Sequence, residues 1–387
     1  MKILYDYQAF DIQRSGGVSN VFSLLVDSVK KAGVDVNVGI AYTENLYMLS
    51  QGYPTKEQQL ERLKNAGKIA PDTGVGDIDW KKVNWFYSKN AIVHGDYDVF
   101  HPTHYYPYFL DYYDFKRPYI VTIHDLAFER LRNYIQFNEG MCLADFDNRR
   151  NIMKSASKVV AISEATKKDI TDIYKVPEEK IDVVYNAYRE LPENYEYNKP
   201  FDFPYILYVG TRQGPLNYKC FIPFFNQIVP FMKEHKEFKL VCTGQKFTKF
   251  ELDMFRQYGL EDRVENHYLN EDGLNNLYHH AFCFVFPSEF EGFGLPILEA
   301  YKNDCPTLLN DIPVFREVAG DCGTYFDIAD GKSLNEKLEN LFALNDNDRN
   351  ALIAKQKERL PLFTAEKMAE GYINVYKSVL KRLTGKI

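Results

Sequence analysis

The sequence predicts an α/β protein built from two parallel-sheet domains of similar size. Its 387 residues exceed the usual size of a single hydrophobic core. Short apolar runs alternate with amphipathic stretches, which is the pattern of strand–helix units around a parallel sheet. The alternation stops at 191–204 (LPENYEYNKPFDFP), where three prolines and several charges indicate a linker. We therefore expect a first domain at 1–195 and a second at 196–364.

The apolar runs give the expected strands. In the first half they lie at 3–7, 34–41, 97–101, 119–124, 159–163 and 181–185. In the second half they lie at 205–209, 239–243, 282–286 and 307–309. The segment 45–80 has weak periodicity, so we expect a long excursion there. Apolar residues at helical spacing over 365–383 predict a closing helix within a final segment of 365–387.

Composition excludes several classes of protein. A formal net charge of -7 argues against a protein whose main role is to bind the phosphate backbone of a nucleic acid. The six cysteines form no CxxC pair, which suits a reducing compartment. Asp6 interrupts the first apolar run, and no stretch of about 18 uncharged apolar residues follows. We expect a cytoplasmic protein, soluble or peripheral at the inner face of the membrane.

The most informative segment is 281–300 (AFCFVFPSEFEGFGLPILEA). It predicts a strand to Phe286, a glycine-containing loop and a helix that begins near Pro296. Such a helix N-terminus presents N–H groups to phosphate or hydroxyl oxygens. Glu291 on the loop and Glu299 in the first helical turn can then grip two parts of one ligand. The alternative is that both carboxylates only complement the helix dipole.

Two other features have both a functional and a structural interpretation. His124 ends an apolar strand and is followed by Asp125, so it is either a ligand-facing residue or a satisfied core histidine. The aromatic run 101–113 (HPTHYYPYFLDYY) also follows a strand. It is either the rim of an acceptor site or an ordinary packed loop. His279 and His280 are adjacent on an expected helix, face different directions and make a poor metal pair.

The segment EGFGLPILEA resembles the E-x7-E signature of glycosyltransferase family 4, also called group 1. Further similarity follows in the same order along the chain, in SGGVSNVF, TIHDL, VVAISEATKKDI, IDVVYNAY, YILYVGTR, NYKCF, PVFREVAGDCG and LFTAEKMAEGYINVY. The resemblance implies the GT-B fold, with two Rossmann-like domains facing across a cleft. The first would lie on the acceptor side, the second would bind a nucleotide sugar, and the C-terminal helix would return to the first.

The resemblance also implies a set of site residues. Glu299 would bind the ribose hydroxyls of the donor nucleotide. Glu291 would meet the hydroxyls of the transferred sugar, assisted by backbone N–H groups of the segment Phe293, Gly294 and Leu295. The donor diphosphate would be neutralised by the cationic pair Arg212 and Lys219, whose spacing is longer than the family pattern.

Four further positions follow from the same resemblance. His124 would sit beside the donor sugar and the acceptor. Gly16 and Gly17 would let the first-domain loop approach the diphosphate or the sugar. Gly210 would lie at the phosphate-binding end of its strand. Without the resemblance, Gly16-Gly17 would indicate nothing, because the pair lacks the GxGxxG pattern of a dinucleotide-binding loop.

The implied activity is transfer of a hexose with retention of configuration and without a catalytic metal or other cofactor. GDP-mannose is the first candidate donor and UDP-hexoses follow. The acceptor would be a glycan or a lipid-linked glycan in surface-polysaccharide assembly, with peripheral membrane association and no nucleic-acid partner. The alternatives are an inactive nucleotide-sugar-binding protein and a GT-B epimerase or phosphorylase.

The sequence lacks the motifs of other enzyme classes. A metal-dependent transferase needs a DxD after an apolar strand, and none of the four DxD sequences, at 77–79, 96–98, 145–147 and 346–348, follows one. A nicotinamide enzyme needs a third glycine after the first strand, and a P-loop enzyme needs GxxxxGK[ST]. We therefore expect no metal site.

Overall fold

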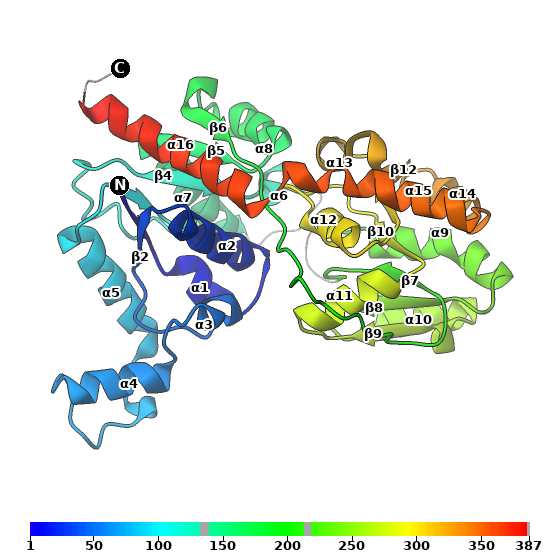
Figure 1. Ribbon diagram of the computed structural model, residues 1–387, viewed down its shortest axis with the longest axis horizontal. Helices are drawn as coiled ribbons and strands as arrows, with labels where there is room; N and C mark the ends of the chain where they lie inside the picture. Colours follow the sequence, from blue (N-terminus) through cyan, green and yellow to red (C-terminus); the bar gives the residue numbers. More distant parts are fainter. Residues whose placement is uncertain (132–138, 213–217, 385–387) are drawn as a thin grey trace. The chain divides into compact units, whose positions relative to one another are not determined.

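The computed structural model describes residues 1–131, 139–212 and 218–384, which form two compact units (Figure 1). The first contains 1–129, 139–187 and 365–384, and the second contains 130–131 and 188–364. The chain thus passes into the second unit after Ala187, earlier than the expected boundary at 195. Tyr195, which the expected boundary assigns to the first domain, donates its hydroxyl to the carbonyl of Asp272 in the second unit. The ring of Tyr197 beside it stacks on His279 at 3.7 Å.

The first unit is built on parallel strands. β1 (Lys2–Tyr5) pairs with β2 (Asp35–Val38) and β3 (Val99–His101), and β5 (Lys158–Ala161) pairs with β4 (Ile120–Ile123) and β6 (Ile181–Val183). A parallel bridge between Phe100 and Tyr119 joins the two three-stranded sheets. All six strands expected in this half are present, within a few residues of the predicted ranges.

Helices complete the first unit. They are α1 (Gln8–Ile12), α2 (Gly17–Lys31), α3 (Leu46–Ser50), α4 (Lys56–Asn65), α5 (Trp80–His94), α6 (Ala127–Leu131), α7 (Glu139–Ser155), α8 (Glu164–Asp169) and α16 (Ala365–Thr384). The excursion 45–80 therefore contains the two short helices α3 and α4, and α4 projects from the unit (Figure 1). Sequence periodicity missed α4 because only Leu60 of its ten residues is buried, whereas the Thr55 and Gln58 capping box that begins it was readable.

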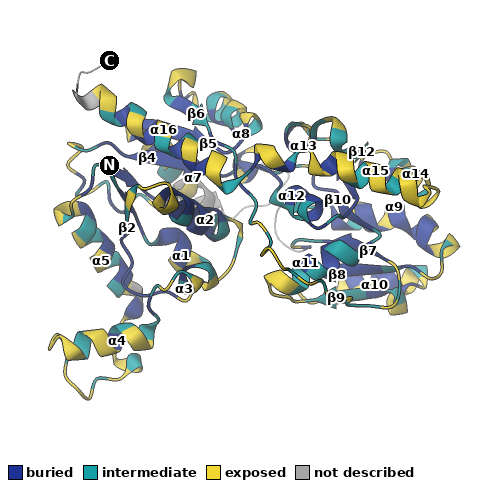
Figure 2. Ribbon diagram, viewed as in Figure 1, coloured by how far each residue is buried: buried dark blue, intermediate teal, exposed yellow. Residues whose placement is uncertain are grey.

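The C-terminal helix α16 returns to the first unit and packs against α2, as predicted. One face is buried and the other exposed (Figure 2). A buried hydrogen-bond network fastens it. The Tyr376 hydroxyl lies 2.7 Å from that of Tyr5 and 2.8 Å from His101 Nδ1, and the Tyr372 hydroxyl lies 3.0 Å from that of Thr122. These bonds tie the end of the chain to β1, β3 and β4.

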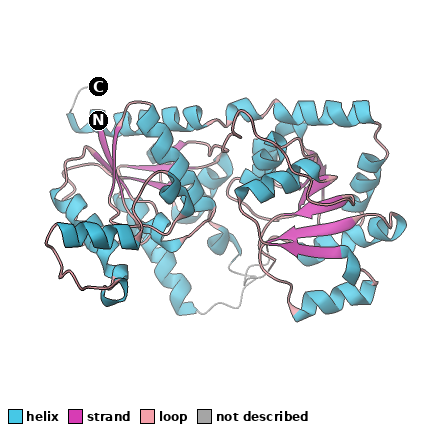
Figure 3. Ribbon diagram, turned by 60° about the horizontal axis from the view of Figure 1, so that its bottom comes forward, coloured by secondary structure: helices cyan, strands magenta, loops and turns pink. Residues whose placement is uncertain are grey.

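The second unit is a doubly wound parallel sheet with helices on both faces (Figure 3). Its strands are β7 (Tyr205–Tyr208), β8 (Lys239–Thr243), β9 (Val264–His267), β10 (Cys283–Phe286), β11 (Thr307–Asn310) and β12 (Thr324–Phe326). The order β12-β11-β10-β7-β8-β9 reverses direction between β7 and β10. The sequence did not predict β9 and β12, because these edge strands are short and only partly buried (VENH and TYF).

The helices of this unit are α9 (Phe221–Glu234), α10 (Lys249–Tyr258), α11 (Glu271–His280), α12 (Leu295–Lys302), α13 (Pro313–Ala319), α14 (Ser333–Phe342) and α15 (Asp346–Lys357). Phenylalanines of α9 dominate the core on one face of the sheet. Each of these helices except α15, which comes after α14, follows a strand. Such a helix begins near the carboxyl edge of the sheet and ends near the amino edge.

Candidate active site

The second unit brings the carboxyl ends of β7 and β10 together where the strand order reverses. The chain after β7 carries Gly210 and Lys219, and the chain after β10 carries Glu291. The amide of Glu289 donates a 2.8 Å hydrogen bond to the carbonyl of Tyr218, which ties the two segments to each other. Ligands of doubly wound sheets bind at this edge.

Lys219 and Glu291 form an ion pair at this edge. The Lys219 Nζ donates to Glu291 Oε1 at 2.7 Å, and the two side chains are 20% and 15% exposed. The ammonium also lies 5.4 Å from the ring centre of Phe286, at the end of β10. Each charge is neutralised by the other, and both remain reachable from solvent. A ligand that offers a phosphate and hydroxyls can replace this pairing with two separate interactions.

The backbone around Lys219 has an unusual conformation. Gly210 has a φ of +141°, and a Cβ there would lie 3.1 Å from Cδ of Lys219. Glycine therefore makes room for the lysine stem. Cys220, directly after Lys219, adopts a left-handed φ of 50°, although it is not a glycine. Such strain is characteristic of functional sites, where the surrounding structure enforces it.

The loop from β10 ends at the N-terminus of α12. Gly294 has a φ of +103°, and a Cβ there would lie 3.1 Å from the ring of Phe315, so glycine is required. Leu295 then begins the helix, with its positive dipole end toward the loop. The Phe293 side chain is buried, with its ring 5.6 Å from that of Phe363. Only the backbone of Phe293 can therefore meet a ligand.

Glu299 is the fifth residue of α12, at the start of the second turn, rather than in the first turn as the sequence suggested. The hydroxyl of Tyr278 on α11 donates to its Oε2 at 3.3 Å. Burial raises the pKa of Glu299 and nearby Glu271 raises it further, while Lys302 and the Tyr278 hydrogen bond oppose the shift. A poorly hydrated carboxylate is a strong acceptor for hydroxyl donors.

Arg212 is placed differently from the expectation. Its side chain is fully buried, and its Nε donates to Glu251 Oε1 at 2.9 Å. Its other two nitrogens donate to the carbonyls of Thr243, at 3.0 Å, and Gln245. The guanidinium also lies over the ring of Phe247. All three nitrogens thus donate to groups within the protein, whereas the sequence led us to expect a side chain directed at a ligand.

In the first unit, Gly16 and Gly17 lie at the start of α2. A Cβ on Gly16 would lie 2.6 Å from Gln13 Oε1, which accepts a 3.0 Å hydrogen bond from the amide of Ser19. Gly16 therefore makes room for a glutamine that caps the helix. A Cβ on Gly17 would meet no atom within 4 Å among the described residues.

His124 follows β4 directly. Its amide donates to the Tyr105 hydroxyl at 2.8 Å, and its ring packs edge-on against Phe22 of α2 at 5.4 Å. Within the described ranges, the ring Nε2 is buried without a hydrogen-bond partner. Burial lowers the pKa of His124 to about 3, with smaller contributions from His104 and Arg149. The imidazole is neutral at pH 7, and its unpaired nitrogen contradicts the interpretation as a satisfied core histidine.

The aromatic run 101–113 is mostly core. His101 has both ring nitrogens bonded, and Tyr105, Tyr108, Phe109 and Tyr113 are buried. The structural interpretation therefore holds for most of the run.

Glu251 and Tyr278 are two residues that the sequence did not single out. Thr248 and Glu251 form a capping box at the start of α10, and this T-x-x-E pattern was readable. Nothing in the sequence indicates that the same carboxylate also holds Arg212. Likewise, no local pattern links Tyr278 to Glu299.

Each of the four DxD sequences contains an aspartate with a local structural role. Asp77 accepts from the Gly74 amide, Asp96 and Asp98 both bind Lys2, Asp147 pairs with Arg150, and Asp348 lies in the first turn of α15. His279 Nδ1 donates a 3.2 Å hydrogen bond to the carbonyl of Asn303, and its ring is nearly perpendicular to that of His280.

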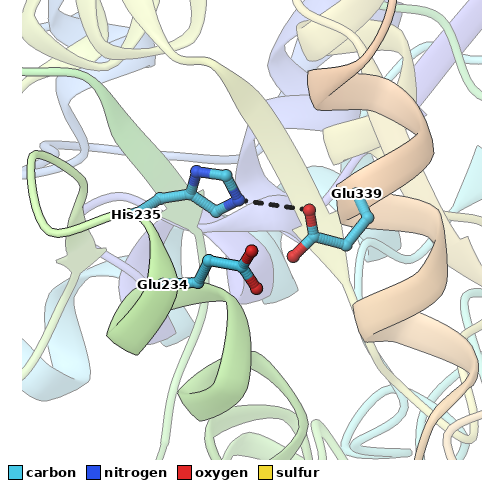
Figure 4. A group of neighbouring side chains, drawn as sticks. All are labelled: Glu234, His235 and Glu339. Carbon is cyan, nitrogen blue, oxygen red and sulfur yellow. Dashed lines mark hydrogen bonds and ion pairs between the residues drawn. The ribbon is translucent and has the colours of Figure 1, made fainter.

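Among the residues that the structure describes, one cluster has the spacing to hold a metal ion. Glu234, His235 and Glu339 each offer a ligand atom, and these atoms lie within 4.8 Å of one another (Figure 4). The His235 Nε2 lies 3.1 Å from Glu339 Oε2. The cluster lies at the end of α9 and therefore at the amino edge of the sheet, opposite Lys219 and Glu291. An ion there would be remote from the candidate active site.

Both halves of the chain match the models of known protein families. Residues 15–189 match the model of Glycosyltransferase Family 4, and residues 176–359 match that of Glycosyl transferases group 1. The chain belongs to the family 4, or group 1, glycosyltransferases. As in the sequence motifs, the similarity thus extends over both units of this family 4 chain.

Curated relatives of this family 4 chain include two bacterial mannosyltransferases. The O-antigen chain mannosyltransferase RfbU of Salmonella typhimurium is 30% identical over 197 residues, which are 50% of this chain and 53% of that protein. The O-antigen chain mannosyltransferase B of Escherichia coli is 27% identical over 241 residues, or 58% and 61%. The chain therefore spans about half to three-fifths of the length of these relatives.

Solved structures share the fold of this family 4 chain. Sucrose-phosphate synthase from Thermosynechococcus elongatus has a TM-score of 0.69 at 16% identity, covering 98% of this chain and 99% of that one. Anabaena HepE, solved with UDP-glucose, has a TM-score of 0.67 at 15% identity, covering 98% and 100%. These similarities confirm the predicted GT-B fold. Among the described residues, no helix combines the length and apolar character that a bilayer span needs.

Proposed function

We propose that this family 4 glycosyltransferase transfers a hexose from a nucleotide sugar to a glycan or lipid-linked glycan, with retention of configuration and without a catalytic metal. The observation that carries the proposal is the Lys219–Glu291 ion pair at the switch point of the second unit. A nucleotide sugar has an anionic diphosphate next to a hydroxyl-rich ring. Lys219 would bind the diphosphate, and Glu291 would accept hydrogen bonds from the sugar hydroxyls.

The rest of the donor would be held by α12. Its N-terminus, formed by Gly294 and Leu295, favours a negative group through its dipole and N–H groups. Glu299, with its partly buried carboxylate facing the Tyr278 hydroxyl, would accept both ribose hydroxyls. The loop and helix would thus bind the sugar, the diphosphate and the ribose in sequence.

The proposed chemistry separates charge. As the nucleoside diphosphate departs, positive charge grows on the sugar ring and negative charge on the leaving phosphate. Lys219 and the helix N-terminus stabilise the phosphate, so a divalent ion is not required. The acceptor hydroxyl attacks from the face that the phosphate leaves, and a departing phosphate oxygen takes its proton. Retention of configuration follows from this front-face attack.

Because Arg212 is buried, we infer that the two residues of the expected cationic pair have different roles. Lys219 would neutralise the diphosphate, while Arg212 would hold the segment after β7 against β8 through Glu251, Thr243 and Gln245. In the first unit, Gly16 and Gly17 would approach the donor, and the unpartnered Nε2 of His124 would meet a substrate hydroxyl.

Mannose from GDP-mannose is the first candidate donor, because two relatives are named O-antigen chain mannosyltransferases. UDP-hexoses are the second, because HepE was solved with UDP-glucose. By the same relationship, the acceptor would be a surface-polysaccharide intermediate, reached in the cytoplasm by peripheral association with the inner face of the membrane.

A screen of GDP- and UDP-sugars with the purified protein tests the proposal. We expect one donor to bind, and the corresponding free nucleoside diphosphate to compete with it. We also expect slow hydrolysis of that donor, which releases the sugar. NMR of the transfer product should show the anomeric configuration of the donor. Binding without turnover in the presence of acceptor glycans would indicate the nucleotide-sugar-binding alternative, and an isomerised nucleotide sugar would indicate an epimerase.

A further inference from the structure

A second histidine of the first unit shares the surroundings of His124. His104 follows β3 by three residues, and β3 joins β4 through the Phe100–Tyr119 bridge. Both histidines therefore lie at the carboxyl ends of neighbouring parallel strands. The ring of Tyr105 lies 4.9 Å from that of His104 and 6.5 Å from that of His124.

Both imidazoles carry a buried nitrogen that lacks a partner. Within the ranges that the structure describes, neither His104 Nδ1 nor His124 Nε2 has one. Buried polar atoms are hydrogen-bonded in the great majority of cases. His101, on the preceding strand, follows this rule, since its two nitrogens lie 2.8 Å from the Tyr376 hydroxyl and 2.9 Å from that of Thr122. The contrast indicates that the other two histidines keep a bonding position for a ligand.

The charges around them select an uncharged ligand. The guanidinium of Arg149 lies 4.7 Å from the Tyr105 ring, but its NH1 is bonded to both oxygens of Glu129 at 2.8 Å. The Glu129 carboxylate also accepts from the Tyr174 hydroxyl at 2.6 Å, so the positive charge is already balanced.

The histidines themselves are neutral. Burial lowers the pKa of His104 and of His124, and Arg149 lowers both further. Asp125 and Asp145 oppose the shift at His104. A neutral imidazole offers one donor and one acceptor, which matches a sugar hydroxyl better than a phosphate or a carboxylate.

We propose that His104 and His124 together bind hydroxyl groups of the acceptor sugar. Tyr105 and the Arg149–Glu129 pair are positioning residues that hold the two rings. The assignment of the sugar as acceptor rests on the proposed function. The site itself rests on the two unpartnered nitrogens and the ring geometry of the first unit.

Saturation-transfer NMR with the full chain tests this site directly. The probes are methyl glycosides of mannose, glucose, galactose and N-acetylglucosamine, titrated in the presence of GDP or UDP. We expect at least one glycoside to bind, His104→Ala to weaken it roughly tenfold through the lost hydrogen bond, and His104→Asn to weaken it less. His94→Ala, an exposed histidine at the end of α5, should have no effect and is the control.

The outcomes separate this site from the proposed function. Nucleoside diphosphate affinity should stay within about twofold in His104→Ala, and circular dichroism should show that the variant is folded. Equal glycoside binding by wild type and His104→Ala, or no binding of any glycoside to wild type, overturns the inference. Failure of both GDP and UDP to bind, with glycoside binding intact, overturns the donor assignment and leaves this site standing.

Discussion

The two units hold their polar groups in opposite ways. In the second unit the charges are paired within the protein: Lys219 with Glu291 at the candidate donor site, and Arg212 with Glu251 in the interior beside it. In the first unit, His104 and His124 are neutral, and each has a ring nitrogen with no partner in the described part of the chain. The substrates proposed for the two sites differ in the same way. A donor diphosphate is charged, whereas acceptor hydroxyls are not.

The comparison also shows that the two ion pairs of the second unit have different roles. The Lys219–Glu291 pair is partly exposed, so ligand binding can separate it at modest cost. The Arg212–Glu251 pair is almost completely buried, and losing one partner leaves an uncompensated charge. Exposure thus distinguishes a pair that a ligand can open from one that holds strands together.

The largest expected effect is on stability, from Arg212→Ala. We expect its free energy of unfolding to fall by roughly 3–5 kcal/mol, because Glu251 would remain buried without its partner. Urea unfolding followed by circular dichroism measures it. The control is Arg256→Ala, which removes an exposed pair with Asp253 on α10 and should cost less than about 1 kcal/mol. A stable Arg212→Ala protein that no longer binds nucleotide would restore Arg212 as a phosphate ligand.

The next effect is on turnover, from Glu291→Ala. If Glu291 holds sugar hydroxyls more tightly in the transition state, the barrier should rise by roughly 2–4 kcal/mol, or about 30- to 1000-fold in rate. Nucleoside diphosphate affinity should stay within about twofold, and Glu291→Gln should fall between wild type and alanine. Glu289→Ala, on the same loop, is the control. A Glu291→Ala enzyme with full activity and a slightly lower Tm would leave only the helix-dipole role.

The third effect is on nucleotide affinity, from Glu299→Ala. Loss of a charge-assisted hydrogen bond to the ribose should weaken nucleoside diphosphate binding by roughly 1.5–3 kcal/mol, measured by calorimetry. Tyr278→Phe removes only the hydroxyl that positions the carboxylate, so its effect should be smaller. Affinity should also fall on acidification, since burial raises the pKa of Glu299 and protonation removes the anionic acceptor. Unchanged affinity in Glu299→Ala would place the ribose elsewhere.

Acid should destabilise the first unit. Burial lowers the pKa of both His101 and His124 to about 3, below the unfolded value of about 6.5. The folded state therefore binds fewer protons, and stability present above pH 6.5 is lost as the pH falls toward 3. Between pH 6.5 and 5 the loss is up to about 2 kcal/mol per histidine. In urea unfolding at several pH values, His124→Gln should flatten this dependence, and an unchanged slope would contradict the neutral state of His124.

Much of the fold was predictable because its buried strands are apolar runs. The strands β1, β4, β7 and β10 read directly from the sequence, and the segment from Phe286 to Glu299 gave the loop and the helix that follow. The edge strands β9 and β12 and the helix α4 were missed, since few of their residues are buried. Hydrophobic periodicity reports burial and is weak wherever a segment lies at the surface.

The sequence indicated where the candidate site residues lie in the fold but not how their side chains are directed. Family motifs singled out Lys219 and Glu291, and both lie at the switch point of the sheet. They could not show that Arg212 turns toward Glu251, 39 residues later, or that Tyr278 reaches Glu299, 21 residues later. His104 was hidden in an aromatic run whose other members mostly pack into the core. Contacts between distant residues depend on tertiary packing, which local patterns do not encode.

The most direct test of the central claim is transfer activity after complete removal of divalent ions. If Lys219 and the N-terminus of α12 stabilise the leaving diphosphate, the rate in excess chelator should equal the rate without it. Glu339→Gln, which removes a ligand from the Glu234, His235 and Glu339 cluster, should behave the same way. Loss of activity in chelator that Mn²⁺ or Mg²⁺ restores would contradict the account, because the diphosphate would then depend on a metal ion.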